Sequence, residues 1–110
     1  MRGAIPAKAL ILTANARSDL KAIHEHIADV ADRETARAFI TKLAVHLERI
    51  AATGHAGVPR DRIRPGLRLS VHGRYNIYFR IVGEETVISR ILHSARLLTP
   101  TAFDEENPQG

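Results

Sequence analysis

Apolar residues recur at steps of three and four along two stretches of the first half of the chain. This spacing places them on one face of an α-helix. The first stripe predicts a helix over about residues 14–30 and comprises Ala16, Leu20, Ile23, Ile27 and Val30. The second predicts a helix that ends at about Gly54 and comprises Ala36, Phe39, Ile40, Leu43, Leu47 and Ile50. Thr13 and Asp32 precede the stripes as capping residues, and the short connection predicts an antiparallel helical hairpin.

The second half of the chain has the period of two that is typical of β-strands. One set of alternate residues is apolar and is expected to face the core: Leu67, Leu69, Val71, Tyr75, Ile77, Phe79 and Ile81. The other set is expected to form an exposed basic face: Arg68, Ser70, His72, Arg74, Asn76, Tyr78 and Arg80. Short turns at His72–Gly73 and Gly83–Glu85 predict antiparallel hairpins.

Three further segments complete the pattern. The apolar run Ala9–Leu12 predicts a strand before the first helix, and residues 86–93 predict a last strand. The apolar residues of that last strand do not separate onto two faces, so its register stays open. Residues 54–66 are rich in glycine, proline and arginine and are interpreted as a loop.

The predicted order β-α-α-β-β-β indicates an α+β fold in which the helical hairpin covers one face of a mostly antiparallel sheet. A chain of 110 residues corresponds to one domain. We expect a single domain over residues 1–110, with its core over about 7–98. Residues 99–110 would form a partly disordered tail.

Composition narrows the class of protein. The chain is 45% hydrophobic and 25% charged, as is typical of a globular domain. It contains no cysteine, which excludes disulfides and thiolate zinc sites. No apolar run approaches the roughly 20 residues that a membrane-spanning helix needs. These observations predict a soluble cytoplasmic protein without a membrane partner.

Positive charge is concentrated in the second half. Residues 15–51 carry six basic and six acidic side chains, whereas residues 60–96 carry eight arginines against three acidic residues. Guanidinium groups bind phosphate and carboxylate groups in bidentate fashion. The arginines therefore indicate either a polyanionic or acidic partner, or a solvated basic surface.

The candidate chemistry is limited. The six histidines are not spaced like metal ligands, and the motifs of nucleotide-binding, glycosidase and serine esterase sites are missing. We therefore expect no metal and no cofactor. His93, at the end of the last strand, is open to two interpretations: a general acid or base on a phosphodiester, or a structural residue bonded to the backbone.

Five short segments carry a resemblance to a known family. They are Ala16–Leu20 with Ile23 and Ile27, Phe39 with Leu43, Arg64–Arg68, Gly73–Arg80, and Arg90–Arg96. In this order and spacing, over residues 7–98, they resemble the RelE/ParE superfamily of bacterial toxins and most closely its ParE branch. The resemblance implies a toxin of a type II toxin–antitoxin system, of the kind linked to plasmid stabilization. It further implies a ParD-like acidic antitoxin that folds on binding and forms a hetero-oligomer with the toxin.

The members of this superfamily divide between two activities, and the resemblance implies one of them. RelE-like members cut mRNA on the ribosome, whereas ParE-like members inhibit DNA gyrase and cut nothing. Asn76 stands where nucleases of this kind have arginine, and Phe103 stands where a tyrosine is expected, so a non-enzymatic gyrase inhibitor is favoured. Leu97 replaces the acidic residue that commonly ends the last ParE motif.

Three hypotheses therefore stay open: a gyrase-binding toxin, an mRNA endonuclease, and a non-toxic antitoxin-binding module. The residues expected to bind the antitoxin or the target are Arg68, Arg74, Tyr78, Arg80, Arg90 and Arg96. No catalytic residue is expected in a binding toxin. The nuclease hypothesis would use His93, Arg90, Arg96 and Arg80.

Overall fold

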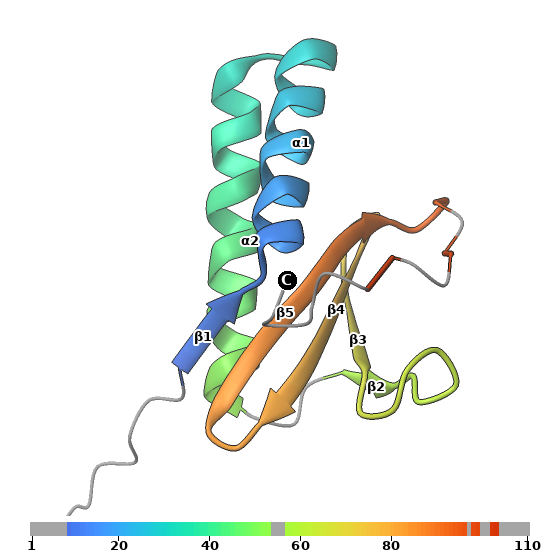
Figure 1. Cartoon of the computed structure of the whole chain (residues 1–110). Coiled ribbons are helices and arrows are strands. Elements are labelled where there is room, and N and C mark those ends of the chain that lie inside the picture. The colour runs from blue at the N-terminus through green and yellow to red at the C-terminus, as the bar shows by residue number, and fades with distance from the viewer. Residues whose placement is uncertain (1–8, 54–56, 97, 100–101, 104–110) are drawn as a thin grey trace, which may run out of the picture.

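Two helices pack against one face of a five-stranded sheet (Figure 1). The computed structural model describes residues 9–53, 57–96, 98–99 and 102–103. Helix α1 spans Ala14–Val30, and helix α2 spans Arg33–Thr53. The predicted α+β fold with an N-terminal helical hairpin is confirmed.

Both predicted helix caps are confirmed. The Thr13 hydroxyl accepts a hydrogen bond from the backbone N–H of Ala16 at 3.0 Å, and the Asp32 carboxylate accepts one from Thr35 at 2.6 Å. Each bond satisfies one of the N–H groups that the first turn of a helix leaves without a partner. The predicted stop at Gly54 lies outside the described residues.

The sheet has the strand order β1-β5-β4-β3-β2. Its strands are β1 (Ala9–Leu12), β2 (Val58–Pro59), β3 (Arg68–His72), β4 (Tyr75–Val82) and β5 (Glu85–His93). Strands β3, β4 and β5 are antiparallel neighbours joined by tight turns, as predicted, with Gly73 and Gly83 at positive φ. Strand β1 pairs with β5 in parallel, which the predicted mostly antiparallel sheet left open. One feature departs from prediction: the expected loop over 54–66 contains the short strand β2.

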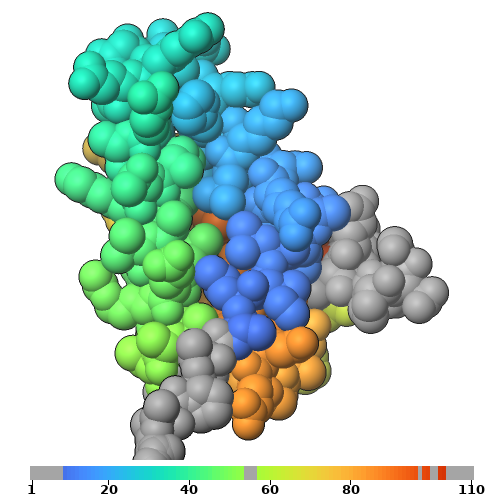
Figure 2. All heavy atoms as spheres, turned by 90° about the vertical axis from the view of Figure 1, so that its left-hand side faces the viewer, coloured from blue at the N-terminus to red at the C-terminus, as the bar shows by residue number. Residues whose placement is uncertain are grey.

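The main core lies between the helices and the sheet. Its buried members are Ala16, Ile23, Leu43, Leu47, Ile50, Ile77, Phe79, Ile88 and Ile91. Figure 2 faces the helical hairpin and shows α1 and α2 side by side over the sheet, with the β4–β5 turn visible below α1. The helical stripes and the apolar side of β4 are therefore packed together, as their periodicity predicted. The exception is Val30, the last residue of the first stripe, which is 68% exposed at the end of α1.

A second apolar cluster covers the opposite face of the sheet, where an exposed basic face was predicted. It comprises Leu67, Leu69, Tyr78, Leu92 and Phe103, with Leu98 and Ala102 packed against it. The prediction was wrong in two respects: Tyr78 is only 4% exposed, and Val71, expected in the core, is 59% exposed.

The orientation of β3 explains this error. Leu69 lies opposite Tyr78 and Ser70 lies opposite Ile77, so the apolar residues of β3 share a face with Tyr78 and not with Ile77. Ser70 and His72 instead point to α2, where both contact His46. The predicted basic face is thus divided between the two sides of the sheet.

A β-bulge explains why the two faces of β5 did not separate in the sequence. Tyr78 pairs with Arg90 but Phe79 pairs with Ile88, so Ser89 is the extra residue. The bulge reverses the alternation at this point. Ile88 and Ile91, three residues apart, therefore both belong to the main core. No helix among the described residues has the length and apolar character needed to cross a membrane.

Candidate functional site

The buried carboxylate of Asp19 joins α1 to β5. It accepts two hydrogen bonds of 2.8 Å from the Arg90 guanidinium and one of 2.9 Å from the backbone N–H of Ile91. Both side chains are largely buried, with 9% and 12% exposure for Asp19 and Arg90. A bidentate pair of this kind fixes the planar guanidinium in one orientation. The charge of Arg90 is therefore balanced within the fold.

Two arginines hold the segment that covers the second face of the sheet. Arg90 donates to the Ala102 carbonyl at 2.8 Å, and Arg64, in the loop before β3, donates to the Phe103 carbonyl at 2.8 Å. The Phe103 ring stands edge-on to Tyr78, with centroids 5.4 Å apart. The part of this face around Tyr78 is thus covered by the chain itself.

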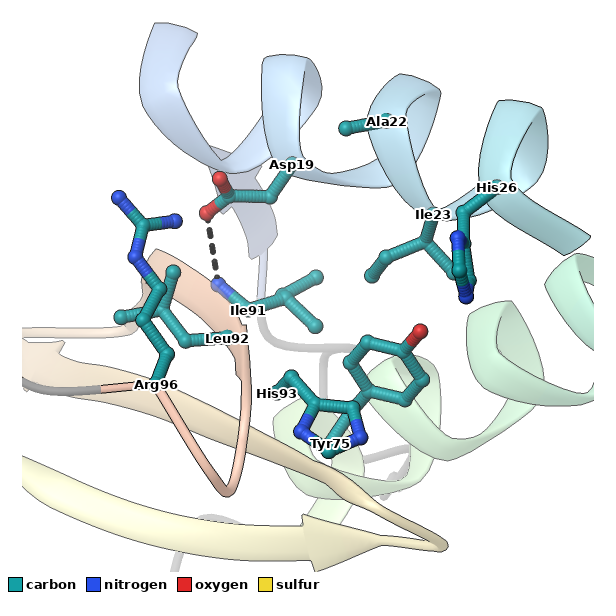
Figure 3. Close-up of a pocket in the computed structure, with 9 residues that line it drawn as sticks. All are labelled: Asp19, Ala22, Ile23, His26, Tyr75, Ile91, Leu92, His93 and Arg96. Carbon is teal, nitrogen blue, oxygen red and sulfur yellow. Dashed lines mark hydrogen bonds between the residues drawn. The ribbon is translucent and has the colours of Figure 1, made fainter.

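A hollow of about 330 Å³ opens between α1 and the end of β5 (Figure 3). We call it the α1–β5 hollow, and it is lined by Asp19, Ala22, Ile23, His26, Tyr75, Ile91, Leu92, His93 and Arg96. Figure 3 shows Arg96 at one end and His26 at the other, with Ile23, Ile91 and Tyr75 between them. The hollow therefore combines an apolar floor with basic groups at its ends.

The geometry of His93 defines which of its nitrogens can reach a ligand. Its Nδ1 accepts a hydrogen bond of 3.1 Å from the backbone N–H of Ala95, so in the neutral ring the proton lies on Nε2. The ring also packs edge-on against Tyr75, with centroids 5.4 Å apart. His93 is exposed. The bond to the backbone is the structural role that one of the two interpretations gave to this residue.

A pair of histidines, His46 and His72, connects α2 to β3. The Nδ1 atoms of His46 and His72 are 2.8 Å apart, and His46 Nε2 lies 3.1 Å from the Ser70 hydroxyl. A hydrogen bond between two Nδ1 atoms requires one ring to donate and the other to accept. Burial lowers the pKa of both histidines, and the positive charges of Arg49 and Lys42 add to the effect on His46 and His72, respectively.

The residues predicted to bind a partner differ in exposure and in their partners. Arg74 and Arg96 are exposed, Arg68 and Arg80 are half-buried, and Arg90 is tied to Asp19. Tyr78, the sixth, is buried beneath Phe103. Of the nuclease set of His93, Arg90, Arg96 and Arg80, His93 and Arg96 line the α1–β5 hollow, and Arg90 is bonded to Asp19, which also lines it.

Two residues with structural or site roles were missed. Asp19 was noted only as part of a matching segment, although an acidic residue on the apolar side of a helix is a signal for a buried ion pair. His26, which lines the α1–β5 hollow, carries no signal in the sequence, because the β4 and β5 residues that complete the hollow lie about 50 or more residues away.

Comparisons with known proteins agree on one family. A family model described as the ParE toxin of the type II toxin–antitoxin system parDE matches residues 10–98. Toxin ParE1 of Mycobacterium tuberculosis, from the strains CDC 1551 / Oshkosh and H37Rv, is 30% identical over 84 residues. This match covers 76% of this chain and 86% of the relative.

Two solved structures share the fold. A chain of the chromosomal ParDE toxin–antitoxin system from P. aeruginosa superposes with a TM-score of 0.70 at 26% identity, over 79% of this chain and 96% of that chain. A chain of the toxin–antitoxin complex RelBE2 from Mycobacterium tuberculosis superposes with a TM-score of 0.53 at 21% identity, over 80% and 99% of the two chains. At that identity the second likeness concerns the fold alone.

Proposed function

Because this chain belongs to the ParE toxin family of type II toxin–antitoxin systems, we propose that it acts by binding DNA gyrase and inhibiting it. A stable antitoxin partner neutralises it. The activity is that of a binding protein and not of an enzyme, and it takes place in the cytoplasm.

The observation that supports binding over cleavage is the engagement of Arg90. Cleavage of a phosphodiester needs positioned acid–base groups and a cation aimed at the charge that develops on the phosphate. The Arg90 guanidinium is directed to Asp19 and Ala102. Tyr78 is covered by Phe103, whose ring has no proton to exchange. These groups serve the fold, which favours a toxin that works through its surface.

The antitoxin is proposed to be ParD-like and acidic, and to fold as it binds. Both structural neighbours come from toxin–antitoxin systems. The excess of arginine over residues 60–96 provides a matching positive charge. A segment that orders on binding needs apolar contacts and charge complementarity together, and the α1–β5 hollow offers both.

A supercoiling assay with purified toxin and gyrase tests the proposed target directly. Inhibition that is dose-dependent and is reversed by the antitoxin is the expected result. A toxin that leaves supercoiling unchanged but cleaves mRNA on ribosomes would instead be an endonuclease. Unimpaired growth of a bacterial host that expresses the chain, with the antitoxin still bound, would indicate a non-toxic module.

The substitution His93→Ala separates binding from catalysis. A binding toxin should keep its inhibition of gyrase within about threefold, because His93 contributes a local bond to Ala95 and a ring contact to Tyr75. A folded, antitoxin-binding His93→Ala protein that has lost all toxicity would favour the endonuclease.

A further inference from the structure

The floor of the α1–β5 hollow is apolar: Ile23 and Ile91 are 5% and 2% exposed, and the Tyr75 ring is half-buried. Ile23 and Ile91 belong to the main core, and the Tyr75 ring packs against it. The volume of about 330 Å³ is at the lower end of the range of about 300–1,000 Å³ that ligand sites occupy. A hollow of this size suits one bulky apolar side chain and its neighbours.

The charge around this floor is positive. Asp19 is the single acidic residue of the lining, and Arg90 already balances it with two hydrogen bonds. Arg96 then adds a full positive charge at one end, and His26 and His93 add nitrogen donors. A site of this composition attracts an anion, because no uncompensated carboxylate among the described lining residues repels it.

Three groups around the floor can donate hydrogen bonds to a ligand. The Tyr75 hydroxyl, which Figure 3 shows pointing to the α1 side of the hollow, has no hydrogen-bond partner among the described residues. The His93 Nδ1 is occupied by Ala95, so its Nε2–H remains as a donor. Arg96, which is exposed, contributes only N–H groups. Each of these three groups can donate a hydrogen bond to a carboxylate.

We propose that the α1–β5 hollow is the docking site for an acidic, amphipathic segment of the antitoxin. One bulky apolar side chain of that segment enters between Ile23 and Tyr75. A flanking Asp or Glu reaches Arg96 and His93. This assignment rests on the proposed antitoxin pairing and locates it between α1 and the end of β5.

The absence of cysteine from the chain gives a direct test of contact. Ala22 lines the hollow and is exposed, whereas Ala44 is exposed on α2 outside it. The variants Ala22→Cys and Ala44→Cys each carry one thiol, and a maleimide labels that thiol on the full toxin. The probe is the purified ParD-like antitoxin proposed as the partner. This protein should slow labelling at position 22 at least tenfold, with less than twofold effect at position 44.

Affinity provides the second readout, measured by calorimetry on the full toxin. Ala22→Phe fills the hollow, and Arg96→Glu reverses its charge. We expect each to weaken antitoxin binding at least tenfold, and Arg96→Glu also to reduce the dependence of affinity on salt. The matched controls Ala44→Phe and Arg37→Glu, at exposed positions on α2, should bind within twofold of the unmodified toxin.

The outcomes distinguish this inference from the proposed function. If the unmodified toxin does not bind the antitoxin, the pairing itself fails. If it binds, but Ala22→Cys stays as reactive as before and Ala22→Phe binds as tightly as its control, the pairing stands and the hollow is not the site. Variants that keep the antitoxin but lose gyrase inhibition would assign the hollow to the target and overturn the inference. Circular dichroism confirms that each variant is folded.

Discussion

The buried carboxylate of Asp19 is the acceptor for hydrogen bonds from two different groups. These are the Arg90 guanidinium and the Ile91 N–H, both of which are largely buried. We predict that Asp19→Ala lowers the free energy of unfolding by about 3–5 kcal/mol, because it leaves a buried guanidinium without its counter-charge. Glu25→Ala, exposed on the same helix, should change it by less than about 0.5 kcal/mol. Urea denaturation measures both, and a cost below about 1 kcal/mol for Asp19→Ala would contradict the assigned role.

The His46–His72 pair makes stability depend on pH. Burial first, then the positive charges nearby, lowers the pKa of both rings below the usual value of about 6.5. Below that value the unfolded chain binds more protons than the folded chain, so folding stability falls as the pH decreases from 6.5 toward the lowered pKa values. We predict a loss of unfolding free energy between pH 7.5 and pH 5 that is smaller in the double variant His46→Gln/His72→Gln. Equal losses in the two proteins would show that the pair does not control this dependence.

At the scale of the elements, the sequence patterns predicted the features that depend on interactions between residues close together in the chain. The two helices and their caps follow from periodicity and from Thr13 and Asp32, because capping and burial of one helical face act within a few residues. The faces of β3 did not follow, since an alternating pattern identifies two faces without indicating which one meets the helices. Its orientation depends on the second cluster, to which Phe103 contributes from the end of the chain.

The candidate site was predicted less completely for a similar reason. Arg90 and Arg96 were chosen from composition and resemblance, but the partner of Arg90 is Asp19, 71 residues away. The bulge at Ser89 also has no sequence signature, so the direction of each β5 side chain was open. Contacts between distant segments decide which arginines are available to a partner, and a pattern read over a short window does not contain them.

At Gly57, just before β2, the backbone leaves no room for a side chain. Its φ is +91°, and a Cβ built there would lie 2.6 Å from the Leu69 carbonyl oxygen and 3.0 Å from the Phe79 ring. Gly66 is also at positive φ, +82°, with nothing near its missing Cβ. We predict that Gly57→Ala destabilises the protein by roughly 1–3 kcal/mol more than Gly66→Ala, because only the first adds a steric clash to the backbone strain. Thermal unfolding of both variants tests this, and equal shifts would show that no close approach exists.

At the scale of the whole molecule, the two faces of the sheet are covered by different parts of the chain. The helical hairpin buries one face with regular stripes, and a short C-terminal segment covers part of the other through Phe103. That segment is held by two arginine–carbonyl bonds, from Arg64 and Arg90. Because Arg90 also binds Asp19 on α1, it connects the C-terminal segment to the helical hairpin.

Phe103 is therefore predicted to stabilise the whole fold and not only its own segment. Phe103→Ala should lower the free energy of unfolding by roughly 3 kcal/mol, since it removes a 3% exposed ring from its contact with Tyr78. Phe103→Leu, which keeps most of the apolar contact, should cost about half as much or less. Hydrogen exchange of the amides of β3 and β4 would report the reach of the effect. Faster exchange in both strands is expected for Phe103→Ala, because Leu69 and Tyr78 share the cluster. Faster exchange confined to the segment after β5 would mean that Phe103 does not stabilise β3 and β4.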